Sequence, residues 1–233
     1  GRYVVKNANM YVRKGEIVGV SGLMGAGRTE LALSLFGNPK NYAVEGEMYF
    51  DGKKVRFRHP GEAIKAGLAY LSEDRKGTGL ILDFDVKTNI TITGLRQLVR
   101  GFFINDNEEI VLAEQFKESL KIKTPSIEQK VLNLSGGNQQ KVSIAKWLFV
   151  KPKLLILDEP TRGIDVGAKY EIYTLMNKLV EEDGMSIIMI SSELPEILGM
   201  SDRIYVVSGG RISGELSREE ATQEKIMTMA VDY

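Results

Sequence analysis

Two neighbouring carboxylates, Asp158 and Glu159, follow directly after the four consecutive aliphatic residues Leu154–Leu157. Such an apolar run predicts a buried strand, and in parallel sheets ligands collect at the carboxyl ends of the strands. A carboxylate at Asp158 suits Mg²⁺ bound through water, and Glu159 suits the orientation or deprotonation of a water that attacks a phosphate. The pair therefore predicts a catalytic, metal-assisted phosphate site.

A glycine-rich segment near the N-terminus supplies a matching phosphate-binding part. It follows the apolar run Ile17–Val20, and Leu31 and Leu35 recur after it at helical spacing, which predicts a strand, a loop and a helix in that order. Glycines allow successive backbone N–H groups to point at a phosphate, and the following helix adds its positive end. The predicted nucleotide-binding residues are Gly22, Leu23, Met24, Gly25, Ala26, Gly27, Arg28 and Thr29, with the Thr29 hydroxyl as a further Mg²⁺ ligand.

A third segment, which begins at Leu134, suits a phosphate in another way. Ser135 precedes two glycines and a run of polar and apolar residues, which predicts a capped helix start with available backbone N–H groups. A serine cap with glycines is also common at helices that bind nothing, so the segment gains its meaning from the loop and the carboxylates. Its predicted binding residues are Leu134, Ser135, Gly136, Gly137, Asn138 and Gln139.

The order of these motifs resembles the nucleotide-binding domain of ATP-binding-cassette (ABC) transporters along essentially the whole chain. Four segments are similar, more narrowly, to the second half of the duplicated ATPases that drive bacterial ribose-, galactose- and xylose-type importers. These segments are Gly22–Leu31, Ser72–Leu80, Leu134–Lys141 and Pro160–Gly167. The resemblance implies an α/β fold with a P-loop NTPase core, a β-rich flank and an inserted helical subdomain. It also implies ATP and Mg²⁺ as ligands, and ATP hydrolysis coupled to monosaccharide uptake.

The same resemblance implies a set of partners. ABC sites form between two domains, so the Leu-Ser-Gly-Gly segment would serve the nucleotide of an N-terminal ABC domain in the same or a paired chain. Asp165, in the turn after Pro160, would cap a helix or cross to that partner. Sugar permease membrane subunits would bind the domain at the cytoplasmic face of the membrane, and a periplasmic or extracellular sugar-binding protein would act indirectly.

Three positions depart from the ABC pattern where it faces the γ-phosphate. Arg28 replaces the usual lysine, Glu73 replaces a glutamine, and Ser192 replaces a histidine, although Glu73 and Ser192 keep their places in the predicted site. These changes predict a degenerate site in this domain beside an intact signature that serves its partner. Tyr3 is a candidate for stacking on adenine, with a place inside a strand as the alternative.

Composition fits an α/β protein with a sizeable core, since 43% of the 233 residues are hydrophobic. Lys+Arg and Asp+Glu both number 31, so the net charge of zero gives no electrostatic reason to expect nucleic acid as a partner. The sequence has no cysteine, which excludes disulfides. No apolar run reaches the roughly 18 residues of a membrane span and no signal peptide is evident, so we expect membrane association through partners.

The motif positions predict one domain over residues 1–233, with a core at 1–76 and 148–233 and a helical subdomain at about 77–147. The helix expected over Asn107–Leu120 would begin at an Asn cap and bury Ile110 and Phe116 on one face. Ser217–Glu220 would open the last helix as a capping box.

Two other functions fit some of these motifs. One is a soluble ABC ATPase of DNA repair or translation; the sequence between Thr29 and Ser135 lacks the long heptad arm of repair types, and no basic linker of the translation type is visible. The other is a structural half that binds nucleotide without hydrolysing it.

Overall fold

The computed structural model describes residues 3–37 and 42–231, which form two compact units. Unit 1 comprises Gly1–Tyr70, Lys153–Glu159 and Asn177–Tyr233, and unit 2 comprises Leu71–Pro152 and Pro160–Met176. The outer limits expected at residues 1 and 233 lie outside the described residues.

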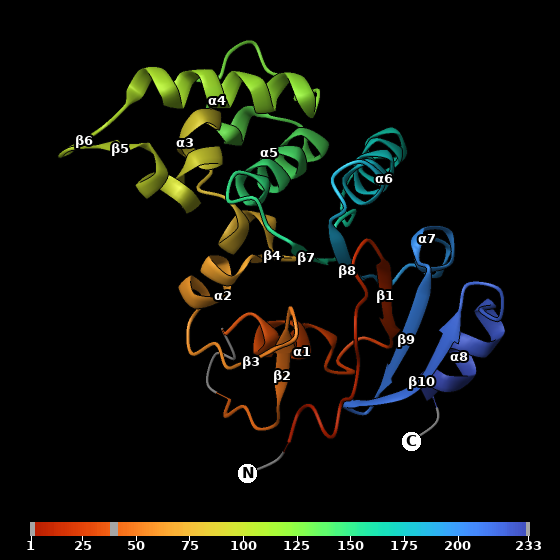
Figure 1. Cartoon of the computed structure of the whole chain (residues 1–233). Helices are drawn as coiled ribbons and strands as arrows, with labels where there is room; N and C mark the ends of the chain where they lie inside the picture. The colour runs from red at the N-terminus through yellow and green to blue at the C-terminus, as the bar shows by residue number, and fades with distance from the viewer. Residues whose placement is uncertain (1–2, 38–41, 232–233) are drawn as a thin grey trace. The chain divides into compact units, whose positions relative to one another are not determined.

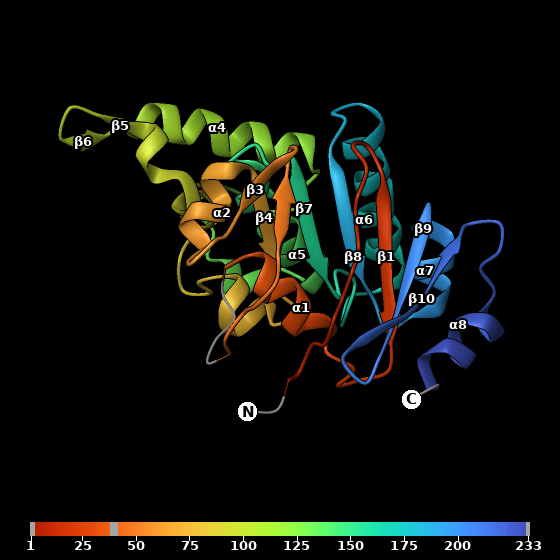
Figure 2. The same cartoon turned by 60° about the horizontal axis from the view of Figure 1, so that its bottom comes forward.

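Unit 1 is built on a six-stranded sheet with the strand order β10-β9-β1-β8-β7-β4 (Figures 1 and 2). The strands are β1 (Ile17–Gly22), β4 (Leu68–Leu71), β7 (Leu154–Asp158), β8 (Ser186–Ile190), β9 (Arg203–Ser208) and β10 (Arg211–Ser217). Strands β7, β8, β1 and β9 run parallel, whereas β10 pairs with β9 in the antiparallel direction. The carboxyl ends of β1, β7 and β8 therefore reach the same edge of the sheet.

The central strands form because their apolar runs are buried continuously, as is typical of parallel strands covered on both faces. Every residue of β8 is buried, and so are the aliphatic residues of β1 and most of β7. Helix α1 (Arg28–Leu35) contacts β1 and β7, while α7 (Leu194–Met200) and α8 (Gln223–Val231) contact β1. Helix α2 (Pro60–Ala66) and the hairpin β2 (Met48–Phe50) and β3 (Lys53–Val55) complete the unit.

Unit 2 is mainly helical. Its elements are the π-helical turn η1 (Arg75–Gly79), α3 (Val86–Thr91), η2 (Ile92–Leu98), β5 (Val99–Arg100), β6 (Phe103–Ile104), α4 (Asp106–Ser119), η3 (Val131–Asn133), α5 (Gly136–Leu148) and the first part of α6 (Val166–Glu181). Helix α3 packs against α4 and α5 (Figure 1). The core between them includes Val86, Ile90, Val142 and Phe149, and the Phe149 ring meets the Phe116 ring edge to face at 6.5 Å.

Helix α4 is present, but its cap differs from the expectation. Asn105, not Asn107, caps the helix by accepting a hydrogen bond from the Glu108 backbone. Ile110 is exposed rather than buried, because Glu109 takes the inward position and its carboxylate accepts a 2.6 Å hydrogen bond from the Thr91 hydroxyl. The buried polar contact therefore sets the rotation of the helix.

The last helix also begins later than expected. Ser217 ends β10, and its side chain exchanges hydrogen bonds with Glu220, so the capping-box residues close a turn instead of a helix. Helix α8 begins at Gln223, where the Thr222 hydroxyl accepts a hydrogen bond from the Lys225 backbone. Among residues 3–37 and 42–231, no helix combines the length and the apolar character that crossing a membrane requires.

Candidate functional site

The glycine-rich loop connects β1 to α1 in unit 1 and confirms the predicted strand, loop and helix. Gly22 has φ +150°, and a Cβ atom there would lie 2.3 Å from the Val207 carbonyl oxygen. Gly27, the residue before α1, has φ +102°. Both positions therefore require glycine. Leu23 and Met24 are exposed, whereas Ala26 is buried, so the loop displays backbone and apolar side chains at its tip.

The two carboxylates lie at the end of β7 in different environments. Asp158 is fully buried, and its Oδ2 atom accepts a 2.9 Å hydrogen bond from the Tyr70 hydroxyl. Glu159 leaves the strand with φ +49°, a left-handed conformation that is uncommon for a residue with a side chain. Its backbone N–H donates to the Ile190 carbonyl at 2.9 Å, which holds this turn to the end of β8.

Arg28, Glu159 and Ser192 come together at this edge of the sheet from three separate segments. The Arg28 Nη1 atom donates to the Ser191 carbonyl at 2.8 Å, and its Nη2 atom lies 3.6 Å from Glu159 Oε1. The Ser192 hydroxyl donates to Glu159 Oε2 at 3.1 Å. The side chains of Arg28 and Glu159 are each 10% exposed. The arginine at the lysine position is thus engaged with the carboxylate expected to act on water.

Oxygen donors for a cation are present in the same unit. The buried Asp158 carboxylate ends β7, and Thr29 lies half-buried in the first turn of α1. A carboxylate and a hydroxyl fit Mg²⁺, which usually takes its remaining ligands from phosphates and water. No group of three or more acidic, His or Cys side chains suited to a metal occurs in the described part of the chain.

Tyr3 lies outside every strand of the sheet, so the alternative of a place inside a strand is wrong. The residue is 61% exposed, and its hydroxyl donates to Glu45 at 3.4 Å. The next residue, Val4, lies close to the phosphate loop in space, because its carbonyl oxygen would be 3.3 Å from a Cβ atom at Gly27. Tyr3 is therefore an exposed residue whose neighbour in sequence, Val4, approaches the loop.

The serine-glycine segment forms the start of α5 in unit 2. Ser135 is the exposed N-cap, and its hydroxyl oxygen accepts hydrogen bonds from the Asn138 backbone at 3.4 Å and the Asn138 side chain at 2.9 Å. A Cβ atom at Gly137 would approach the Ala168 side chain to 2.5 Å. Leu134 is half-buried, while the buried Gln139 donates to the Val131 carbonyl.

Glu73 and Asp165 also belong to unit 2, where both carboxylates are engaged. Glu73 accepts a 2.9 Å hydrogen bond from Arg162. Asp165 accepts one at 2.9 Å from the Ala168 backbone, as a cap of α6 does. Of the two roles expected for Asp165, the structure thus displays the cap. The partner of Glu73 was not expected from the sequence, because 89 positions separate it from Arg162.

Two cations of unit 2 are less exposed than the sequence predicted. Arg75 is half-buried, and its Nη1 atom donates to Gln140 at 3.4 Å, while burial lowers the pKa of its guanidinium. Lys146 is buried and donates to the Gly79 carbonyl, and burial lowers the pKa of its ammonium group to about 8. Helical spacing was the available signal for Lys146, which lies one turn after the buried Val142.

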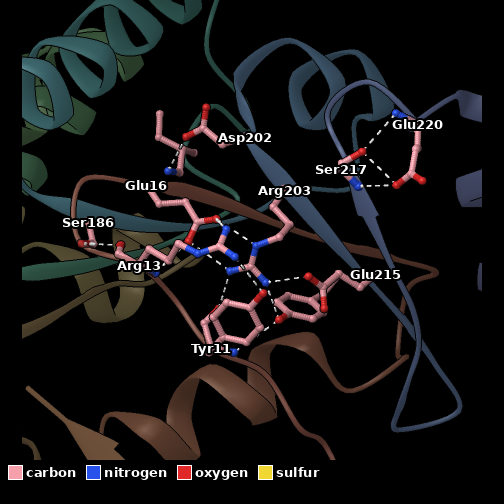
Figure 3. A network of polar contacts seen from close by, with 11 residues as sticks. Tyr11, Arg13, Glu16, Ser186, Asp202, Arg203, Glu215, Ser217 and Glu220 are labelled. Carbon is pink, nitrogen blue, oxygen red and sulfur yellow. Dashed lines mark hydrogen bonds and ion pairs between the residues drawn. The ribbon is translucent and has the colours of Figure 1, made fainter. Parts of the chain in front are cut away.

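A further arginine–glutamate pair lies at the amino end of β1, away from the phosphate loop (Figure 3). Arg203 donates to both carboxylate oxygens of Glu16 at 2.8 and 3.0 Å, and to the Tyr11 carbonyl at 2.7 Å. Burial would raise the pKa of Glu16, but the hydrogen bonds from Arg203 and the Arg13 backbone outweigh it and lower that pKa. Arg203 also lies 3.9 Å from the centre of the Tyr11 ring.

The chain is similar to known proteins over most of its length. Residues 5–162 match the family model described as ABC transporter. The chain is 58% identical over 228 residues to the L-arabinose transport ATP-binding protein AraG of Geobacillus stearothermophilus, covering 98% of this chain and 44% of the relative. It is 60% identical over 230 residues to the xylose import ATP-binding protein XylG of Thermoanaerobacter pseudethanolicus, covering 99% of this chain and 45% of the relative.

A solved structure of an ATP-binding cassette of an ABC transporter has the same fold. It superposes with a TM-score of 0.83 at 24% sequence identity and covers 98% of this chain and 93% of that chain. The chain spans a little under half the length of the curated relatives it matches. The family model covers well over half of the chain, and the relatives exceed half identity over nearly all of it. The chain belongs to the ABC transporter family and has the P-loop α/β fold of its ATP-binding cassettes.

Proposed function

We propose that this chain is the nucleotide-binding domain of a bacterial sugar importer, which binds Mg·ATP and couples its hydrolysis to the uptake of a monosaccharide. The names of the arabinose and xylose relatives support the substrate class. These relatives favour a transporter over an ATPase of DNA repair or translation. In this proposal the domain lies at the cytoplasmic face of the membrane, bound to sugar permease subunits, and a sugar-binding protein acts from the other side.

The observation that carries the proposal is the meeting of Arg28, Glu159 and Ser192 at one edge of the sheet. It brings the end of the glycine loop next to the carboxylates of β7. The loop amides would bind the phosphates, and Thr29 and Asp158 would hold Mg²⁺, which supplies charge neutralisation for the phosphates when bound. Glu159 would orient the attacking water, with Ser192 holding one of its carboxylate oxygens.

The site of this domain would bind nucleotide and turn it over slowly. Arg28 contacts Glu159, and its planar guanidinium replaces the compact ammonium group that usually binds phosphate at this position. Glu73 and Ser192 likewise lack the chemistry of the usual glutamine and histidine. The contact between Arg28 and Glu159 also favours the second candidate function, in which the domain is a structural half of the ATPase that binds nucleotide without hydrolysing it. Calorimetric titration with Mg·ADP and a steady-state phosphate-release assay on the 233-residue chain separate the two functions. Turnover at the rate of an intact ABC dimer would contradict the degenerate site.

The second part of the proposal concerns the place of the chain in a longer protein. The chain covers 44–45% of the sugar importer relatives, and its four motif segments resemble the second half of duplicated ATPases, so we propose that it is the C-terminal cassette of such a protein. Its signature at the start of α5 would then contact the nucleotide held by the N-terminal cassette. We also propose that residues 77–147 form the helical subdomain of the cassette and that 1–76 and 148–233 form its core.

Ser135 allows a matched test of this action on a partner site. Aspartate and asparagine both cap helices as well as serine does, so Ser135→Asp and Ser135→Asn should fold alike. Only aspartate adds an anion where the partner's γ-phosphate would lie. We expect Ser135→Asp to lower ATP-dependent sugar uptake by the complete transporter by about 100-fold or more, as loss of an oxyanion contact does, and Ser135→Asn to lower it far less.

Gly137 is a poorer site for this test, because any side chain there collides with Ala168. A second comparison uses the catalytic glutamates. Glu159→Gln should reduce uptake less than the corresponding change in the N-terminal cassette. Equal losses from the two changes would support two equivalent sites and contradict the asymmetric proposal.

A further inference from the structure

Arg28 is the one side chain of the phosphate loop that reaches the catalytic glutamate in the described residues. Its guanidinium is divided between two acceptors: Nη1 donates to the Ser191 carbonyl at 2.8 Å, and Nη2 lies 3.6 Å from Glu159. Arg28 is also the first residue of α1, where the helix end attracts a phosphate. The guanidinium therefore has two anions as possible partners, the carboxylate that it contacts and the phosphate that the loop would bind.

The two contacts of Arg28 differ in strength. The bond to the Ser191 carbonyl is short and buried, and Ser191 is itself fixed because its hydroxyl donates to the buried Glu196 at 2.7 Å. The contact with Glu159 is longer than a normal charge-assisted hydrogen bond, which spans about 2.7–2.9 Å. An anion that offers shorter contacts can take the Nη2 side of the guanidinium while the Nη1 side stays on Ser191.

Glu159 has hydrogen bonds that do not depend on Arg28. Its other carboxylate oxygen accepts the Ser192 hydroxyl at 3.1 Å, and its backbone N–H stays bound to Ile190. Release from Arg28 would therefore leave the carboxylate in place but without its counter-charge.

We infer that Arg28 is a positioning residue that exchanges anions: it neutralises Glu159 in the nucleotide-free domain and transfers to a nucleotide phosphate on binding. The inference rests on the proposed nucleotide-binding function. Phosphate and Glu159 then compete for one guanidinium, so the carboxylate opposes nucleotide binding through Arg28. Removal of the carboxylate charge should tighten binding only while Arg28 is present.

The test is a double-mutant cycle on the 233-residue chain with Mg·ADP as the probe, because ADP excludes turnover as a cause of any change in Kd. The four proteins are the unaltered chain, Glu159→Gln, Arg28→Gln and the double variant. We expect Glu159→Gln to lower the Kd about tenfold in the unaltered background and less than about threefold in the Arg28→Gln background. Adenosine, which has no phosphate, should bind all four proteins alike.

Direct repulsion between Glu159 and phosphate is the competing explanation, and it predicts the same gain in both backgrounds. Equal gains, or no gain in the unaltered background, would overturn the inference and leave the proposed function standing. Failure of the folded chain to bind Mg·ADP would overturn both. If Arg28→Gln does not fold, Arg28→Met serves in its place, since methionine also removes the cation for which phosphate and Glu159 compete, and the gain from Glu159→Gln should again shrink.

Discussion

Two arginine–glutamate pairs lie at opposite ends of β1, and they differ in almost every contact. Arg203 binds Glu16 through two short hydrogen bonds, and its remaining nitrogen donors reach Tyr11, Tyr205 and Glu215 (Figure 3). Arg28 makes a single long contact with Glu159, and its short hydrogen bond goes to the backbone carbonyl of Ser191. The first pair is saturated, whereas the second leaves donor capacity for another anion.

The difference shows how one pair of residue types serves two purposes. A buried ion pair stabilises a fold only when further hydrogen bonds satisfy both groups, and Arg203 and Glu16 meet that condition. A pair beside a binding loop must instead remain exchangeable. Completeness of the hydrogen bonding, more than burial, therefore distinguishes the Arg203–Glu16 pair from the Arg28–Glu159 pair.

The largest expected effect follows from breaking the saturated pair. Arg203→Met should lower the free energy of unfolding by about 3–5 kcal/mol, because it leaves the Glu16 carboxylate buried without its main partner. Urea unfolding followed by circular dichroism measures the loss. Adding Glu16→Gln should restore part of it by removing the stranded charge. A loss below about 1 kcal/mol would show that this network does not support the sheet.

A smaller effect is expected for Lys146, a buried cation that donates a hydrogen bond to the Gly79 carbonyl. Its folded pKa of about 8 lies below the unfolded value of 10.5, so the folded state binds fewer protons between these two pH values. The cost of burying the charge is full below pH 8 and is relieved as the pH rises. From pH 8 to 10, unfolding free energy should rise by about 2 kcal/mol relative to Lys146→Met.

Paired denaturation curves at several pH values check this slope. A constant difference between the two proteins over that range would mean that Lys146 titrates at the same pH in both states.

The smallest expected effect comes from breaking the exchangeable pair. Arg28→Met should cost about 1–2 kcal/mol of unfolding free energy, because Glu159 retains Ser192 and its carboxylate lies at the turn after the strand. Measured beside Arg203→Met under the same conditions, it should be clearly the milder change. A larger loss than that of Arg203→Met would reverse the assignment of the two pairs.

Local sequence signals predicted the parts of the fold that depend on local physics. Apolar runs define β1, β7 and β8, and glycines at positive φ define the loop between β1 and α1. The exact start of α4 was not predictable in this way, because Asn105, Asp106 and Asn107 are all capping residues. The choice of Asn105 goes with the burial of Glu109 against Thr91, a contact made by tertiary packing.

The candidate site likewise has features that local sequence predicts and features that depend on tertiary packing. Its residue types could be identified from their motifs, but their partners could not, since 163 positions separate Arg28 from Ser191 and 33 separate Glu159 from Ser192. Such pairs depend on the strand order, in which β1 lies between β8 and β9. The sequence indicated that Arg28 departs from the family pattern, and only the structure identifies what that arginine contacts.

The position of the only tryptophan gives the molecule a built-in optical probe. Trp147 lies in α5, within unit 2, and the Lys146 ammonium is 5.0 Å from the centre of its ring. Excitation at the red edge of the indole band selects this ring over the nine tyrosines, so its emission reports on unit 2. A chain that loses indole emission before its circular dichroism would reveal that the helical unit melts ahead of the sheet, without any label being added.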